Sequence, residues 1–377
     1  MLMVTHACNL NCSYCYEAHK SDKKMSLETA KKVILDEVEM IQGTPRFEEI
    51  EIDFMGGEPL TNFDLIKQIV EWLERMPMPM PYICFATTNG TLLTPPRKEW
   101  LRLHRNTIQL CLSYDGDSQM QQINRGALAT TVDLPFFKEV WPEQKFHMTV
   151  SQETLSGLAR AILDMQRLGY MMEVSLAQGV LWTKADAICF YNQLSSLSES
   201  FLSDNRLRPI HLLTRSLLGI GRAEPDRKQR KYCGAGTNMV AYGIDGHAYG
   251  CHMFSPIVMG EGQGIEAKAI NWSDEYLCED PMCGDCILRN RCPTCLGYNF
   301  RYRGSVAKRD PNACLMVLAS MVAACEHQIK MLSKLNRLET FKEAQRARAA
   351  LEAYPLLLRT SFPNASGPFT RSSLCAR

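Results

Sequence analysis

The chain has 377 residues, enough for one large domain or for one large and one small domain. Its 42 basic and 41 acidic residues leave a net charge of +1, which gives no electrostatic basis for binding nucleic acid. The sequence has neither an apolar run long enough to cross a membrane nor a signal-peptide pattern at its start. We therefore expect a cytoplasmic protein that binds neither nucleic acid nor a membrane.

Sixteen cysteines are many for a reducing compartment, where such a density indicates metal or redox chemistry rather than disulfide bonds. Three of them lie within residues 8–15 and eight lie within residues 233–314. This distribution predicts two metal-bearing regions joined by a cysteine-poor segment. The remaining cysteines are expected to be small core residues (Cys84, Cys111, Cys189, Cys325) or incidental (Cys375).

The first 205 residues alternate between predicted strands and helices. The predicted strands are 1–5, 50–55, 82–87, 107–113, 145–150 and 171–177, and the predicted helices are 27–42, 62–75, 96–104, 134–141, 154–168 and 184–200. Serial units of this kind give parallel strands with right-handed crossovers. Six units are too few to close an eight-stranded barrel. The fold class is therefore α/β, with an open, partial (β/α)6 TIM-like barrel over residues 1–205.

From Arg206 the helical periodicity weakens. Met239–Ile244 and His247–Gly250 flank Asp245-Gly246, which predicts a β-hairpin. Helical patterns return at 315–325 and 328–351, with a break between them. The predicted divisions are a barrel (1–205), a cysteine-rich domain (206–325), a C-terminal helix (326–354) and a loose, Pro- and Ser-rich tail (355–377).

Cys8, Cys12 and Cys15 follow directly on the first predicted strand, with Tyr14 before the third cysteine. Three thiolates at C-x3-C-x2-C spacing can occupy three corners of an iron–sulfur cube and leave one iron without a protein ligand. An iron with a free position can bind a small molecule. A structural zinc site usually has four protein ligands, so the triplet favours a reactive cluster, with zinc as the alternative.

Further polar motifs follow the next predicted strands, where barrels place their chemistry. Gly56-Gly57-Glu58-Pro59 ends the second strand, and Asn89-Gly90 ends the third. Ser113 ends the fourth, with Asp115-Gly116 just after it. Each motif alone is also typical of an ordinary turn. Their common location at strand ends favours one shared site.

Together, the cysteine triplet, the Gly-Gly-Glu-Pro segment and Ser113 with Asp115-Gly116 resemble the core of the radical S-adenosylmethionine (SAM) enzymes, over about residues 1–200. The resemblance implies that Cys8, Cys12 and Cys15 hold a [4Fe-4S] cluster whose open iron binds SAM. It implies further SAM contacts: the turn (Gly56, Gly57, Glu58, Pro59) for the amino group, Ser113 and Arg125 for the carboxylate, and Asn89 near the ribose. A surface arginine is the alternative reading of Arg125.

The second cysteine field is similar to the SPASM extension, which holds two auxiliary [4Fe-4S] clusters. By this resemblance Cys283, Cys286, Cys292 and Cys314 hold the distal cluster, and Cys233, Cys251 and Cys295 hold the one nearer SAM. The fourth ligand of the nearer cluster stays open, and Cys278 is one candidate. Two residues separate Cys292 from Cys295 where the familiar pattern has three, which puts the ligand geometry in doubt. A pair of zinc ribbons is the alternative.

The resemblance also implies a chemistry, in which SAM is cleaved reductively to a 5′-deoxyadenosyl radical that takes a hydrogen atom from a C–H bond. The two best-represented substrate classes are ribosomal precursor peptides and sulfatases. Sulfatase maturases have an aspartate, the proposed base, directly after the second auxiliary cysteine, whereas Cys251 is followed by His252. A histidine can take a proton near neutral pH, so His252 is the candidate catalytic base. The departure favours a peptide substrate.

We therefore expect an enzyme, a radical SAM/SPASM maturase that installs a C–C, ether or thioether cross-link in a precursor peptide. One alternative is a sulfatase-type maturase that oxidises Cys or Ser to formylglycine, and another is a non-catalytic Fe–S or zinc scaffold. An electron donor such as flavodoxin or ferredoxin is an expected partner. Because the chain starts at the first predicted strand, we expect the leader peptide to bind the barrel directly or through a separate leader-peptide-binding protein.

Overall fold

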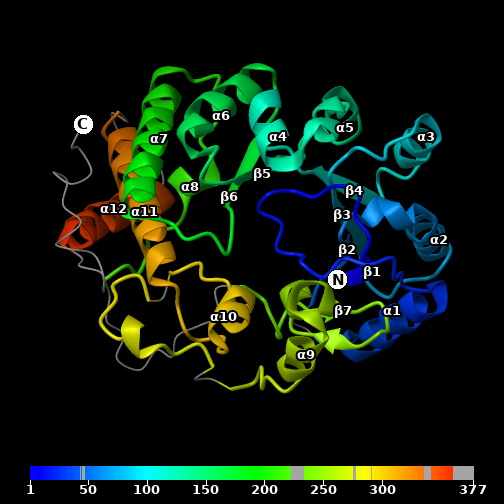
Figure 1. Cartoon of the computed structure of the whole chain (residues 1–377). Coiled ribbons are helices and arrows are strands. Elements are labelled where there is room, and N and C mark those ends of the chain that lie inside the picture. Colours follow the sequence, from blue (N-terminus) through cyan, green and yellow to red (C-terminus); the bar gives the residue numbers. More distant parts are fainter. Residues whose placement is uncertain are drawn as a thin grey trace. The chain divides into compact units, whose positions relative to one another are not determined.

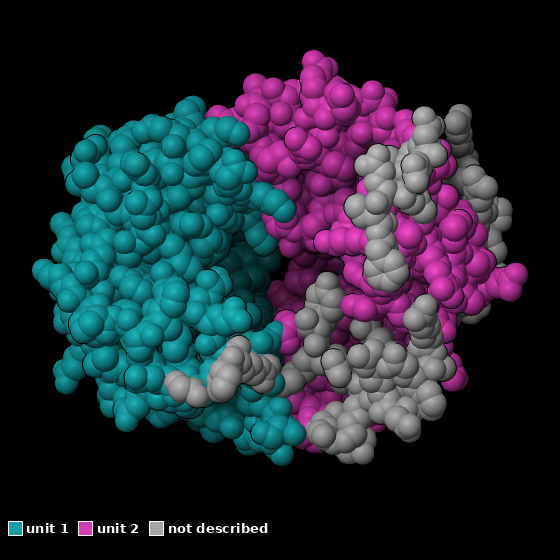
Figure 2. All heavy atoms as spheres, turned by 180° about the vertical axis from the view of Figure 1, so that it is seen from behind, with its two compact units in different colours: residues 1–147, 234–273 teal, residues 148–233, 274–377 magenta. Residues whose placement is uncertain are grey.

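A computed structural model describes residues 1–42, 44, 47–221, 233–274, 277–289, 291–334 and 341–359. Contacts divide the chain into two compact units, coloured separately in Figure 2. Unit 1 comprises Met1–His147 and Gly234–Ser273, and unit 2 comprises Met148–Cys233 and Asp274–Arg377. Each unit thus combines part of the predicted barrel with part of the cysteine-rich region. The domain boundaries at 205, 325 and 354 stay predictions.

Unit 1 is built on a six-stranded sheet with the order β4-β3-β2-β1-β7-β8. Its strands are β1 (Leu2–Thr5), β2 (Ile50–Gly56), β3 (Tyr82–Thr88), β4 (Ile108–Leu112), β7 (Ala241–Tyr242) and β8 (Ala248–Tyr249). Strands β1 to β4 pair in parallel, and β7 adds to β1 in parallel. Helices α1 (Leu27–Ile41), α2 (Phe63–Leu73) and α3 (Pro95–Leu103) lie on the outer side of these strands (Figure 1).

The remaining unit 1 helices are α4 (Ser118–Arg125), α5 (Leu134–Val140) and α9 (Pro256–Lys268), with the short 3-10 turns η1 (Pro59–Asn62), η2 (Ala127–Thr131) and η4 (His252–Phe254). The Ser26 hydroxyl caps α1 by accepting a hydrogen bond from Thr29 N at 3.0 Å. The predicted hairpin is confirmed, because β7 and β8 pair antiparallel around Gly246, whose φ of 79° suits glycine.

Helix α4 lies in a stretch that the sequence predicts to be a polar loop, and that prediction is wrong. Asp117 caps the helix by accepting a hydrogen bond from Met120 N at 2.8 Å. Three of the four residues that α4 buries are polar: Gln121, Asn124 and Arg125. The helix is therefore held by hydrogen bonds from its buried face and has no apolar periodicity to reveal it.

Strand β5 (Phe146–Val150) begins at the end of unit 1, where His147 forms a parallel bridge with Ser113 just after β4. It continues into unit 2 and pairs with β6 (Met172–Leu176). All six predicted strands are present, four of them in one parallel sheet, which confirms the α/β fold of the partial-barrel class. The other elements of unit 2 are η3 (Leu155–Gly157), α6 (Leu158–Arg167), α7 (Lys184–Ser203), α8 (His211–Thr214), η5 (Pro281–Cys283), α10 (Leu296–Arg303), α11 (Pro311–Ser333) and α12 (Phe341–Arg359).

Helix α11 is the core helix of unit 2, packed against α7, α8 and α12. In the described part of the chain it alone is long and apolar enough to cross a membrane, but 67% of its most apolar stretch is buried in the protein. The predicted break after residue 325 is wrong. Cys325, His327 and Gln328 are all buried, so packing holds the helix continuous to Ser333.

Helix α12 corrects the predicted tail, because it runs through Pro355 to Arg359. Ala353 and Leu357, on either side of the proline, are 1% and 0% exposed. Burial of this apolar face outweighs the hydrogen bond that the proline removes from the helix. Residues 360–377, including Cys375, lie outside the described residues.

Candidate functional site

The site in unit 1 begins where β1 ends and the loop of Cys8, Cys12 and Cys15 follows. The three cysteines are partly buried, and Cys15 N donates a hydrogen bond to Cys12 O at 3.1 Å. Burial, with smaller contributions from Glu58 and the neighbouring Cys12 thiol, raises the pKa of the Cys8 thiol to about 11. The pKa of the Cys12 thiol is also raised, mainly by burial and in part by the Cys15 thiol. The loop thus gathers the three thiols into one electrostatically connected group.

Gly56 and Gly57 hold the end of β2 directly against this loop. A Cβ on Gly56 would lie 2.3 Å from Thr5 O, and one on Gly57 would lie 2.8 Å from the Cβ of Cys8. Both distances are shorter than any real contact, and the φ of Gly56 (151°) is also one that glycine tolerates. Only glycine therefore lets the turn approach the cysteine loop so closely.

The Glu58 carboxylate is buried and engaged within the protein. Oε1 accepts from Leu60 N at 3.0 Å and from the Thr88 hydroxyl at 2.7 Å, and Oε2 accepts from Asn89 N at 2.7 Å. The side chain is only 1% exposed. Glu58 therefore fastens the end of β2 to the end of β3, and it is the backbone of the turn, which Glu58 N ties to Ala7 O at 2.9 Å, that lies along the cysteine loop.

Asn89, predicted as a cofactor contact, links the end of β3 to the same loop. Its amide Nδ2 donates to Asn9 Oδ1 at 3.0 Å, and its Oδ1 accepts from the Thr91 hydroxyl at 2.7 Å. Ser113 lies 9% exposed at the end of β4, where its N–H donates to Thr88 O at 2.8 Å. Both predicted contacts therefore lie at successive strand ends of unit 1.

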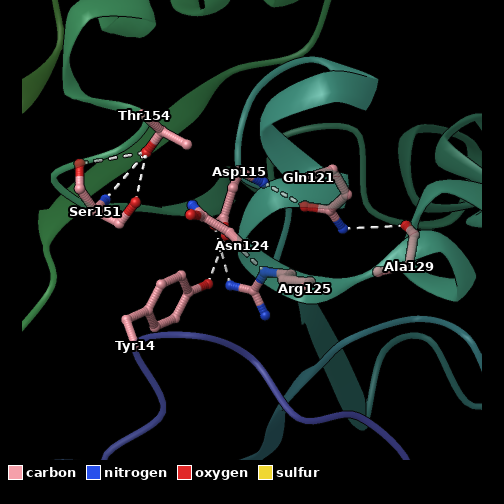
Figure 3. Close-up of polar contacts among 8 residues, drawn as sticks. All are labelled: Tyr14, Asp115, Gln121, Asn124, Arg125, Ala129, Ser151 and Thr154. Atoms are coloured by element: carbon pink, nitrogen blue, oxygen red, sulfur yellow. Dashed lines mark hydrogen bonds and ion pairs between the residues drawn. The ribbon is translucent and has the colours of Figure 1, made fainter.

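Arg125 lies in a buried polar network around Asp115 (Figure 3). Its Nε and Nη2 donate to the two carboxylate oxygens of Asp115 at 2.9 and 3.1 Å. The Tyr14 hydroxyl donates to Asp115 at 2.5 Å, and Asn124 donates to it at 3.1 Å. Arg125 also lies 5.4 Å from the centre of the Tyr14 ring. The structure thus contradicts the alternative of a surface arginine and shows Arg125 fixed beside the cysteine loop.

Asp115 and Tyr14 are the residues of this network that sequence reasoning left without a role. The signal was present, because the aromatic residue precedes Cys15 and Asp115 is followed by Gly116. Ser13 N also donates to Asn124 O at 2.8 Å, so α4 is joined to the cysteine loop by backbone as well as side chains. Figure 3 also shows a smaller turn of unit 2, in which Ser151 N donates to the Thr154 hydroxyl at 3.1 Å after β5.

His252, the candidate base, lies in unit 1 directly after Cys251. Its Nε2 is 3.2 Å from the hydroxyl of Tyr16, the residue after Cys15, and the two rings are tilted at a centroid distance of 5.9 Å. Burial lowers the pKa of His252 to about 4, so the imidazole is neutral near pH 7. Sequence reasoning missed Tyr16 as its partner. The role of base stays a prediction.

Unit 2 contains the four cysteines predicted for the distal cluster: Cys283, Cys286, Cys292 and Cys314. Burial is the main cause of the raised pKa of Cys314, and each of the other three thiols raises it further. Cys286 N donates to Cys283 O at 3.2 Å. Cys292 and Cys314 also line a cavity of about 400 Å³, together with Cys295. The four thiols therefore affect one another, and two of them, Cys292 and Cys314, line the cavity.

The three cysteines predicted for the nearer cluster are divided between the units. Cys233 and Cys295 lie in unit 2, where Cys233 adds to the effect of burial in raising the pKa of Cys295. Cys251 lies in unit 1. Cys278, the candidate fourth ligand, is buried in unit 2, and its carbonyl accepts a hydrogen bond from Arg309 at 3.0 Å.

Within the part of the chain that the structure describes, no three His, Cys, Asp or Glu side chains are placed to bind one metal ion. The chemistry of the donors fits an iron–sulfur cluster, because the predicted ligands of each group are cysteine thiolates.

The other cysteines largely follow expectation. Cys84, Cys111 and Cys325 are buried, as predicted for small core residues. Cys189, on α7, is only partly buried. The prediction of a core position is therefore wrong for that residue.

Comparison with known proteins agrees with this geometry. Residues 2–120 match the sequence model of the Radical SAM superfamily. An uncharacterized protein of Methanocaldococcus jannaschii is 36% identical over 116 residues, which are 31% of this chain and 38% of the relative. The radical SAM cyclopropyl synthase TigE of Paramaledivibacter caminithermalis is 26% identical over 195 residues, which are 46% of this chain and 40% of the relative. The chain thus spans about two fifths of the length of the curated relatives it matches.

Two solved structures have a similar fold. Native anSMEcpe with bound AdoMet and Kp18Cys peptide has a TM-score of 0.64 at 16% identity, covering 89% of this chain and 99% of that one. Streptococcus suis SuiB bound to the precursor peptide SuiA has a TM-score of 0.54 at 15% identity, covering 82% and 74%.

The parallel sheet, the three-cysteine loop and the turn against it form a domain of the partial-barrel class. Its residues 2–120 are similar in sequence to the radical SAM superfamily. The family implies SAM and a [4Fe-4S] cluster as cofactors, and the gathered thiols of Cys8, Cys12 and Cys15 fit such a cluster.

Proposed function

We propose that the protein is a radical SAM/SPASM maturase that acts on a ribosomally made precursor peptide and installs a cross-link between side chains. The observation that carries the proposal is the presence, in one chain, of two separate thiol groups: the triplet beside the Gly56–Gly57 turn and the four-thiol group of unit 2. When bound, the first cluster and SAM supply a 5′-deoxyadenosyl radical that takes a hydrogen atom from the substrate.

In this proposal Cys8, Cys12 and Cys15 hold the SAM-binding cluster, and the unit 2 thiols hold an auxiliary cluster. The backbone of Gly56 and Gly57 accepts the SAM amino group. Ser113 and Arg125 orient the carboxylate, the latter held by Asp115, and Asn89 approaches the ribose. We assign the amino group to the backbone of the turn and not to the Glu58 carboxylate, because the carboxylate oxygens already accept hydrogen bonds inside the protein.

A peptide is the substrate that the comparisons support best. Both structural neighbours were solved with a bound peptide, and for SuiB this is its precursor peptide. The relative TigE is named a cyclopropyl synthase, and closing a cyclopropyl ring forms a carbon–carbon bond, one of the bond types in this proposal. His252 in place of an aspartate after Cys251 counts against a formylglycine-forming activity on sulfatases. The partners proposed are a low-potential donor such as flavodoxin or ferredoxin and, where required, a separate leader-peptide-binding protein.

The test has two parts, both under anaerobic conditions. Protein reconstituted with iron and sulfide is expected to release 5′-deoxyadenosine from SAM when dithionite is added. Cys12→Ala should abolish this release, whereas Cys189→Ala, at a cysteine outside both fields, should retain it. A preparation that binds only zinc and does not cleave SAM would falsify the enzyme and leave the scaffold alternative.

The second part identifies the substrate. Co-expression with a small precursor encoded beside the gene is followed by mass spectrometry of the peptide. A loss of about two hydrogen atoms per modification, with the linked residues located by fragmentation, is the expected result. A peptide that returns unmodified from an enzyme able to cleave SAM, or one that carries formylglycine, contradicts the cross-linking proposal.

A further inference from the structure

Arg309 is a buried cation of unit 2 that lies beside the four-thiol group. Its side chain is held in the protein interior, at 4% exposure, just before α11. Nη2 donates to Cys278 O at 3.0 Å, and the backbone N–H of Arg309 donates to Asp280 Oδ2 at 2.7 Å. The residue is therefore fixed at both its backbone and its guanidinium.

The same aspartate fixes the position of Cys283. The other oxygen of Asp280, Oδ1, accepts from Met282 N at 2.9 Å and so caps the turn η5, which ends at Cys283. One carboxylate thus positions both the arginine and the first thiol of the group. The guanidinium and the thiol are held in one local structure rather than meeting by chance on long, mobile side chains.

Arg309 and two of the thiols line the same cavity. Its lining includes Arg309, Cys292 and Cys314. Because Asp280 holds both Arg309 and the turn that ends at Cys283, a positive charge is fixed in the same part of unit 2 as the thiol group.

The acidic residues nearby are already engaged. Asp280 accepts the two backbone hydrogen bonds described above. Asp310, which also lines the cavity, accepts from Asn312 N at 2.9 Å and lies 3.9 Å from Arg303. Arg303 is thus already close to a carboxylate, and Arg309 donates to the carbonyl of Cys278.

We propose that Arg309 is a positioning residue that raises the reduction potential of a four-iron cluster held by Cys283, Cys286, Cys292 and Cys314. The inference rests on the proposed function, in which this group holds a cluster. Reduction adds one electron and one negative charge to the cluster, and no proton moves because a guanidinium stays protonated. A buried cation stabilises the more negative, reduced form, since charges interact more strongly where water is excluded.

The test is a potentiometric titration of the reconstituted full-length protein, with dithionite as the reductant and electron paramagnetic resonance as the readout. The signal of this cluster is identified as the one that Cys286→Ala removes. In Arg309→Gln the reduced-to-oxidised ratio at a fixed potential should fall at least tenfold, equivalent to about 59 mV toward more negative potential for one electron. Arg206→Gln, at an exposed arginine of the same unit, should leave the ratio unchanged.

Iron content separates the outcomes. A fully loaded Arg309→Gln protein with an unchanged or more positive potential overturns the inference. If that variant does not retain iron, Arg309→Lys, which keeps the charge, should load and stay close to the wild-type potential. Failure of the lysine variant to load would assign Arg309 to assembly and overturn its role in the potential. A wild-type protein without a four-iron cluster on this group would instead refute the proposed function.

Discussion

At the scale of single residues, the candidate site depends on buried polar groups that bind one another and not only on the cysteines. Glu58 is the clearest case, because a carboxylate that is 1% exposed is costly to bury unless its oxygens are satisfied. It accepts hydrogen bonds from Leu60, Thr88 and Asn89, and so joins two strand ends beside the cysteine loop.

We expect Glu58→Gln to lower the free energy of unfolding by about 2–3 kcal/mol, since an amide turns an NH2 donor toward groups that already donate. Urea unfolding of the reconstituted protein under anaerobic conditions measures the loss. Glu39→Gln, at an exposed position on α1, serves as the control and should change stability by less than about 0.5 kcal/mol. Equal stabilities of the two variants would show that the Glu58 contacts contribute little.

The pair formed by Asp115 and Arg125 permits a second prediction. Asp115→Asn leaves a buried guanidinium without its counter-charge and should cost about 3–5 kcal/mol in unfolding free energy. The double variant Asp115→Asn/Arg125→Met removes both charges and should be more stable than Asp115→Asn alone. The measurement is again urea unfolding. Additive losses would mean that the two side chains are not coupled.

The residue types of this site were readable from the sequence, but their partners were not. The cysteine spacing and the Gly-Gly-Glu-Pro turn indicated where the chemistry lies. Spacing along the chain cannot show that the Glu58 oxygens point into the protein or that Tyr14 meets Asp115, 101 residues away. Such contacts depend on which strand ends the fold brings together.

At the scale of elements, the predictions succeeded where hydrophobic periodicity is regular, and failed where a helix buries polar residues or continues through a proline. The parallel strands and helices such as α1 and α2 follow clear hydrophobic periodicity. Helix α4 buries mainly polar residues and was predicted as a loop. Helix α12 continues through Pro355 because its neighbours pack in the core, which local propensity does not reveal.

The packing of α7 on α11 contains a buried histidine with a predictable pH response. His327 is 0% exposed, and its Nδ1 lies 2.9 Å from the Ser198 hydroxyl. Burial, with the charge of Lys330, lowers the pKa of His327 to about 4. Because this pKa lies well below 7, the His327 imidazole is neutral in the folded protein near pH 7. The adjacent Glu326 instead accepts hydrogen bonds from Tyr191 at 2.7 Å and from Tyr354 at 2.6 Å.

Because the folded-state pKa is depressed, protons bind preferentially to the unfolded chain once the pH falls below about 6.5. We expect the unfolding free energy to fall by about 1.4 kcal/mol between pH 7.5 and 5.5 on account of this one group. His327→Gln should remove that part of the slope, whatever its effect on stability at pH 7.5. His247→Gln, at an exposed histidine of the hairpin, should retain the wild-type slope. Parallel slopes for all three proteins would contradict the assignment.

At the scale of the whole molecule, the sequence order and the compact units do not coincide. Unit 1 combines the first four barrel strands with the hairpin and Cys251, and unit 2 combines β6 with the four-thiol group. The change in composition along the sequence predicts a boundary near residue 205. The compact units differ from this because they are defined by contacts between segments that are far apart in the sequence. The two cysteine fields stay predictions, supported by the mutual effects of the thiols of Cys12 and Cys15 and of those of Cys283, Cys286, Cys292 and Cys314.

The separation of the two thiol groups predicts that their clusters can be removed independently. The wild-type protein should contain about twelve irons, four for each of three clusters. Replacing Cys8, Cys12 and Cys15 by alanine should remove about four irons and abolish 5′-deoxyadenosine release, because no iron then remains to bind SAM. Replacing Cys286 and Cys292 by alanine should also remove about four irons, yet leave SAM cleavage in place while modified peptide is lost. Iron analysis and chromatography of the nucleoside measure both effects, with Cys189→Ala as the control. SAM cleavage that survives loss of the triplet, or a single substitution set that removes all the iron, would contradict the independence of the two groups.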